Sequence, residues 1–101
     1  MTKDLGRIVE ALSEEVLLEG LAEEAAELAH AALKLSRILR GENPTPVTER
    51  EAARNLFEEL ADMCLMSQVI KQKLEFNEKG IEAIVSYKID RWFKRLEAAG
   101  K

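Results

Sequence analysis

The chain has 101 residues, which is the length of one domain, so we expect a single domain over residues 1–101. Its formal net charge is −4, from 15 Lys and Arg against 19 Asp and Glu, which argues against a nucleic-acid binder because such proteins carry a basic surface. No run approaches the ~18 apolar residues that a bilayer requires. The amino terminus shows no secretory signal and a single cysteine cannot build a disulfide framework, so we expect a cytoplasmic protein without membrane contact.

Composition predicts an all-α protein, because Ala, Leu, Glu and Lys are abundant while Pro and Gly number only two and five. A chain of this length buries roughly 65% of its unfolded surface on folding. That core is thin for long helices, so oligomerisation is favoured.

The first half of the chain predicts a short helix, a long helix and a loop. Residues 4–13 can form the short helix, and Ser13 can cap the helix that follows. Leucines then recur at helical spacing from about Glu14 to Arg40, where Gly41 supplies a C-terminal stop. Residues 41–47 contain both prolines and predict a loop.

The second half predicts two further helices. Residues 48–51 match a capping box, and apolar residues at helical spacing then mark a second long helix to about residue 76. Residues 77–80 predict a turn, and a last helix is expected from Ile81 to about Ala98. The two long helices would each measure roughly 40 Å. Their equal lengths and short connection predict an antiparallel hairpin within a helical bundle that oligomerisation completes.

The first long helix carries carboxylates on its apolar face. On a helical wheel with Leu17 as the origin, Glu24 lies about 20° from the centre of the leucine stripe. Glu27 lies at the edge of the stripe, and Glu23 lies further out. Acidic residues are common on solvated helix faces, but a charge inside an apolar stripe is rare without a partner.

The second long helix repeats this arrangement with Glu59 and Asp62. Each pair, Glu24 with Glu27 and Glu59 with Asp62, has the i, i+3 spacing that makes side chains neighbours on a helix. In an antiparallel hairpin all four lie about 17 to 24 Å from the connecting loop, so they should meet. Four negative charges in one partly buried place either protonate or bind cations, and an all-oxygen set favours Mg²⁺ or Mn²⁺.

Two other side chains invite chemical interpretation. Glu27 and His30 form the ExxH half-motif of carboxylate-bridged di-iron bundles. Asp62 stands where the second His should be and the chain has no other His, so we expect His30 to be a solvated or interface residue. Cys64 lies near the apolar side of its helix and is expected to be a buried, unreactive thiol.

The last helix places cations on its apolar face. Lys88 falls among apolar residues, while Arg91 and Arg95 flank the same edge. If this helix folds back from the turn, these cations come near the height of Glu59 and Asp62. They would then either neutralise surplus carboxylates or hold phosphate oxygens opposite bound metals, and the sequence leaves both interpretations open.

These motifs together resemble the MazG-like, all-α nucleoside triphosphate pyrophosphohydrolase family. The resemblance rests on EExxE at residues 23–27, ExxD at 59–62, the connection at 41–48 and the segment 88–92, and it spans about residues 14–96. The reaction it implies is cleavage of the α–β phosphoanhydride of a nucleoside triphosphate, which gives the monophosphate and pyrophosphate. Relatives assemble as dimers or tetramers with sites between adjacent subunits.

The resemblance also implies roles for individual residues. The Mg²⁺ ligands would be Glu24, Glu27, Glu59 and Asp62. Glu23 would be a further ligand or a water-orienting base, while Lys88 and Arg91 would contact phosphates. Residues 5–13 offer no aromatic residue or His that could grip a base, so the nucleotide is not identified. We therefore expect a Mg²⁺-dependent hydrolase that cleans or balances nucleotide pools; the alternative is a non-catalytic helical-bundle interaction module.

Overall fold

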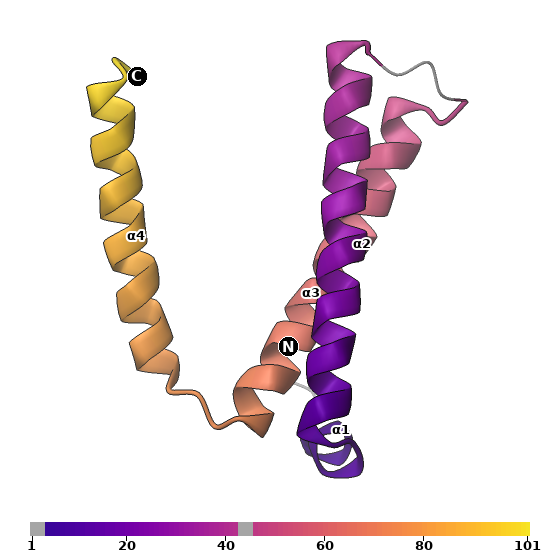
Figure 1. Cartoon of the computed structure of the whole chain (residues 1–101), viewed down its shortest axis with the longest axis vertical. Helices are drawn as coiled ribbons and strands as arrows, with labels where there is room; N and C mark the ends of the chain where they lie inside the picture. The colour runs from indigo at the N-terminus through magenta and orange to yellow at the C-terminus, as the bar shows by residue number, and fades with distance from the viewer. Residues whose placement is uncertain (1–3, 43–45) are drawn as a thin grey trace.

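The protein is all-α, as its composition predicts. The structure is a computed structural model and describes residues 4–42 and 46–101. In these residues there is no strand, and the helices, in chain order, are α1 (Gly6–Ala11), α2 (Glu14–Arg40), α3 (Glu49–Lys73) and α4 (Glu78–Ala98) (Figure 1). Part of the predicted loop, residues 43–45, lies outside the described residues, as does the amino terminus at residues 1–3.

Both ends of α2 and the start of α3 are set by the residues that the sequence indicates, whereas α3 ends at Lys73, before the predicted end near residue 76. The hydroxyl of Ser13 accepts a hydrogen bond from the Val16 amide at 3.2 Å, which caps α2. Gly41 adopts a left-handed conformation with φ of 71° and ends the same helix. The hydroxyl of Thr48 accepts from the Glu51 amide at 3.1 Å, so the predicted cap of α3 is confirmed.

The turn predicted at residues 77–80 is wrong, because this segment starts α4. The side chain of Asn77 accepts a hydrogen bond from the Gly80 amide at 3.1 Å and acts as the N-cap. The chain reverses earlier, and there Glu75 has a φ of 54°. α1 is also shorter than the predicted helix over residues 4–13.

α2 and α3 form the predicted antiparallel hairpin (Figure 1). Its buried core consists of Leu17, Val69 and Ile70, at the end away from the connecting loop. Partly buried apolar side chains pack around this core: Leu5, Val9, Leu21, Met66 and Leu74. The Lys73 ammonium donates to the Val9 carbonyl at 2.7 Å, which ties α1 to α3. The core therefore joins three helices.

Small residues let the two long helices approach each other. A Cβ atom added to Gly20 would lie 3.1 Å from the Met66 methyl group, so a larger residue there would displace Met66. Towards the loop, the buried side chains among residues 4–42 and 46–101 are Ala31 and Ala52. The hairpin is thus filled by large apolar side chains at one end and by alanines at the other.

α4 stands apart from the hairpin (Figure 1). In the described part of the chain, extensive packing joins α2 to α3, and a smaller contact joins α1 to α3; α4 buries no residue. Its large apolar side chains are exposed: Ile84, Val85, Tyr87, Ile89, Trp92 and Phe93. The apolar stripe predicted on this helix therefore exists, but the described part of the chain does not cover it.

Some residues expected to be buried are exposed. Cys64 is exposed, because it lies on a side of α3 that neither α2 nor α4 covers. Leu39 and Leu60, which continue the apolar stripes, are 63% and 48% exposed. None of the helices in the described residues has the length and hydropathy that a membrane span requires.

Candidate metal centre

Carboxylates from both long helices meet in the middle of the hairpin. Glu24 and Glu27 lie one turn apart on α2, and Glu59 faces them from α3. One oxygen from each of the three lies within 4.8 Å of the others. The structure thus brings together three of the four side chains that the sequence assigns to a metal site.

Two oxygens of this cluster are buried without a hydrogen-bond partner. They are the Oε2 atoms of Glu24 and Glu59, whose side chains are otherwise partly exposed. An acceptor removed from water without a donor is costly, and it is more costly when it carries charge. A cation between the helices would satisfy both oxygens, so these residues fit a bound divalent metal.

Burial and neighbouring charges raise the pKa of two carboxyl groups of the cluster. Burial raises the pKa of Glu24, and the charges of Glu27, Asp62 and Glu23 raise it further. Burial likewise raises the pKa of Glu59, followed by the charge of Glu27 and then those of Asp62 and Glu24. Carboxylates that repel each other in this way gain from a divalent ion, and oxygen-only ligands are those that Mg²⁺ and Mn²⁺ prefer.

Asp62 and Glu23 lie at the rim of the cluster. Asp62 is exposed one turn beyond Glu59, and it is not among the three residues whose oxygens converge. Glu23 is exposed next to Glu24 on α2. The charge of Asp62 raises the pKa of both Glu24 and Glu59, and the charge of Glu23 raises the pKa of Glu24. Both rim side chains are exposed, so they are available for a bound ion or for water.

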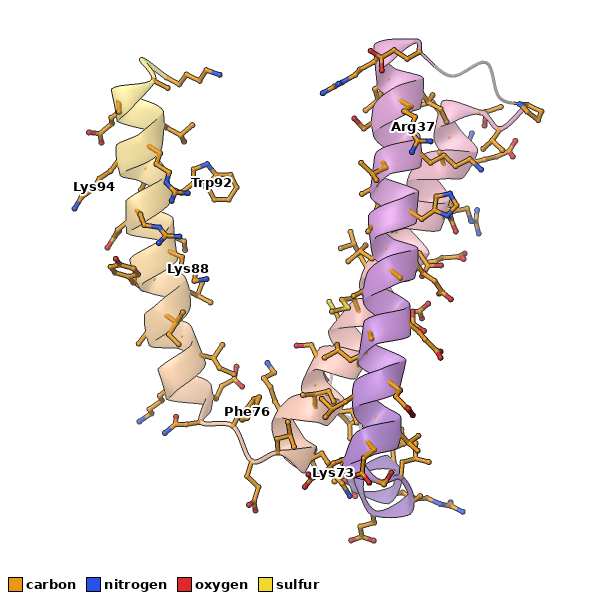
Figure 2. All side chains as sticks on the ribbon, viewed as in Figure 1. Arg37, Lys73, Phe76, Lys88, Trp92 and Lys94 are labelled. Atoms are coloured by element: carbon orange, nitrogen blue, oxygen red, sulfur yellow. The ribbon has the colours of Figure 1, made fainter. Side chains whose placement is uncertain are left out.

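The structure does not bring Lys88 and Arg91 to the carboxylates of the same chain. Both stand on α4, which does not pack against the hairpin (Figure 1). The Arg91 guanidinium lies 6.0 Å from the centre of the Tyr87 ring. Figure 2 shows Lys88 and Trp92 projecting towards the side of the hairpin. A hollow of about 510 Å³ is lined here by Lys88, Arg91, Trp92, Arg95 and Leu96.

A second hollow, of about 160 Å³, adjoins the carboxylates between α2 and α3. It is lined by Glu27, His30, Ala31, Lys34, Asn55 and Glu59. The sequence reasoning set His30 aside as solvated or interfacial, and it did not single out Lys34 or Asn55. The spacing could have indicated Lys34, because residues four and seven positions apart share a helix face, and it follows His30 by four and Glu27 by seven.

Comparison of the chain with protein-family models, with curated proteins and with solved structures finds no match. Function is therefore argued from the residues of the site and from their geometry.

Proposed function

We propose that this protein is a Mg²⁺-dependent nucleoside triphosphate pyrophosphohydrolase, with Mn²⁺ as a second metal that the site accepts. One observation carries the proposal: Glu24, Glu27 and Glu59 converge from two helices, and two of their buried oxygens have no donor. Such an arrangement is unfavourable without a cation. The motifs of the MazG-like family supply the reaction class.

The residues divide the chemistry between them. Glu24, Glu27 and Glu59, with Asp62 from the rim, would hold the metal. When bound, the metal neutralises phosphate charge and makes a nearby water more acidic. Glu23 is exposed beside this place and would orient the attacking water and accept its proton. Attack by water at phosphorus breaks the α–β phosphoanhydride, and pyrophosphate leaves.

Lys88 and Arg91 would reach the phosphates from a second copy of the chain. The hollow at Lys88 and Arg91 is basic, whereas the carboxylate cluster carries uncompensated negative charge, so the two surfaces are complementary. The exposed apolar face of α4 and a hollow of about 340 Å³ on α3, beside Leu60 and Cys64, remain uncovered in one chain. A homodimer or homotetramer would cover these surfaces and place Lys88 and Arg91 against the partner's phosphates.

The test is a panel of standard and modified ribo- and deoxyribonucleoside triphosphates, incubated with the protein and Mg²⁺. We expect release of pyrophosphate from at least one of them. Glu59→Gln should reduce this turnover by at least about 100-fold, as removal of a group that positions transition-state charge does. Glu58→Gln is the matched control, because Glu58 is exposed and pairs only loosely with Arg54, at 3.9 Å. Turnover of no nucleotide would count against the proposal.

The exposed face of α4 also favours a second candidate, a non-catalytic interaction module. Such a module would use the apolar residues of α4 for a partner and would need no metal. It predicts that saturating Mg²⁺ leaves the melting temperature unchanged and that no nucleotide is hydrolysed. The panel and a thermal melt therefore separate the two candidates.

A further inference from the structure

The hollow beside the carboxylates has walls of opposite character. Glu27 and Glu59, which belong to the metal cluster, line one part of it. His30, Lys34 and Asn55 line the rest and offer ring nitrogen, ammonium and amide donors. α2 supplies His30 and Lys34, one turn apart, and α3 supplies Asn55 one turn before Glu59. The hairpin itself therefore holds both walls.

The donors of this hollow are not used by the protein. Within residues 4–42 and 46–101, the side chains of His30, Lys34 and Asn55 form no hydrogen bond or ion pair. Lys34 is partly buried and shares the hollow with two carboxylates, yet its ammonium lies beyond ion-pair distance from both. The Lys34 ammonium is therefore separated from the acidic cluster by the hollow and forms no salt bridge across it.

The volume limits what can fill this space. Small-molecule pockets usually measure roughly 300 to 1,000 Å³, so about 160 Å³ is too small for a whole nucleotide. A part of a nucleotide, such as one phosphoryl group, fits this volume.

The charges select the same ligand. Lys34 and the neighbouring donors attract an anion, but Glu27 and Glu59 repel one unless a divalent cation lies between. A phosphoryl group that binds a divalent cation on one side and an ammonium on the other satisfies both walls. Neither a free anion nor a second metal ion does so.

We propose that the hollow at His30, Lys34 and Asn55 is a phosphate subsite that binds one end of Mg²⁺-pyrophosphate, the leaving group of the reaction. Lys34 neutralises the phosphoryl oxygens, and His30 and Asn55 donate hydrogen bonds to them. The inference rests on the proposed function, because it requires the metal at the neighbouring carboxylates. It differs from the expected role of Lys88 and Arg91 in that the subsite lies within a single chain.

The test is calorimetric titration of the full chain with inorganic pyrophosphate in saturating Mg²⁺. Lys34→Met keeps the length of the side chain and removes its charge, and we expect pyrophosphate affinity to fall by about tenfold or more, as loss of a charge-assisted hydrogen bond does. Lys34→Arg should retain most of the affinity. The matched control is Arg37→Met, since Arg37 lies on α2 near the loop and does not line the hollow (Figure 2). Titration with Mg²⁺ alone should show that Lys34→Met binds the ion no more weakly than the wild type, because the variant removes only a positive charge near the carboxylates.

Several results would overturn the inference. They are absence of pyrophosphate binding to the wild type in Mg²⁺, unchanged affinity in Lys34→Met, or an equal loss in Arg37→Met, which would indicate only long-range attraction. The nucleotide panel keeps this failure distinct from failure of the proposed function. If the wild type hydrolyses a nucleotide and Lys34→Met binds pyrophosphate normally, the phosphate subsite is refuted and the proposed enzyme activity stands. If pyrophosphate binding depends on Lys34 but no nucleotide is hydrolysed, the subsite stands and the proposed enzyme activity is refuted.

Discussion

The hairpin of α2 and α3 and the single helix α4 are built on the same pattern but end in different states. Each carries an apolar stripe interrupted by charge, acidic in the hairpin and basic on α4. The hairpin buries part of its stripe and forces Glu24 and Glu59 together, whereas α4 leaves its stripe and its cations exposed. A helical wheel therefore identifies the face that needs a partner, but not whether the same chain provides it.

The difference between the hairpin and α4 has a function only if a second copy of the chain covers α4 in solution. Mixing two inactive variants is the strongest test of this. Glu59→Gln removes a cluster carboxylate and Arg91→Ala removes a cation of α4. Each should be inactive alone. After the two are refolded together at equal amounts, the activity should recover to about a quarter of wild type, since half of the dimers then contain one intact site. No recovery would show that the cations do not act across subunits.

Truncation of single apolar side chains to alanine should distinguish the buried stripe of the hairpin from the exposed stripe of α4. Leu17→Ala removes a side chain that is only 3% exposed, and it should cost about 2 to 5 kcal/mol of stability at every protein concentration. Ile84→Ala removes one that is 57% exposed, so it should lower the melting temperature only by weakening association. Melts over a hundredfold range of concentration check this. A loss of stability in Ile84→Ala that is independent of concentration would mean that α4 packs within its own chain.

Magnesium should stabilise the hairpin through its carboxylates. At a concentration 100 times its Kd, a ligand that binds only the folded state adds about 2.7 kcal/mol. We therefore expect the melting temperature to rise by several degrees in Mg²⁺ for the wild type and for Glu58→Gln. Glu24→Gln should show little of this rise, because Glu24 supplies one of the converging oxygens. An equal rise in all three proteins would place the ion elsewhere.

The smallest expected effect is the pH dependence of the metal-free protein. Glu24 and Glu59 have raised pKa values when folded, so their contribution to stability is complete below the ordinary Glu range and is lost as pH rises through the raised values. Glu59→Gln removes one of these charges and should be as stable as the wild type or more so. Its advantage should grow as pH rises above the ordinary Glu range in chelator-treated samples. A large loss of stability in Glu59→Gln would instead identify Glu59 as a structural residue.

Local signals predicted most of the hairpin. The caps at Ser13 and Thr48 and the stop at Gly41 depend on a few neighbouring residues, so the ends of α2 and the start of α3 are confirmed. The convergence of Glu24, Glu27 and Glu59 follows from helical periodicity and from the shared distance to one loop.

The predictions that failed concern which helix faces are covered, rather than where the helices lie in the sequence. Cys64 is predicted to be buried, but it is exposed, because none of the helices in the described residues covers its side of α3. The sequence also predicted that α4 folds back towards Asp62, which it does not. The direction of α4 depends on the backbone conformation near Glu75, and helical periodicity gives no information about that conformation. The sequence did not indicate Lys34, because most lysines on helices are solvated. Its place in the hollow depends on Asn55 and Glu59, which lie opposite it on α3.

The uneven filling of the hairpin has a dynamic consequence. Its large buried side chains lie at the α1 end, whereas beyond the carboxylates, towards the loop, only Ala31 and Ala52 are fully buried among the described residues. Without a cation, we expect this loop-side half to open locally and its amide protons to exchange with solvent faster than those around Val69. Occupation of the carboxylates would join the two helices at mid-length, so metal binding would set how often the loop-side half opens.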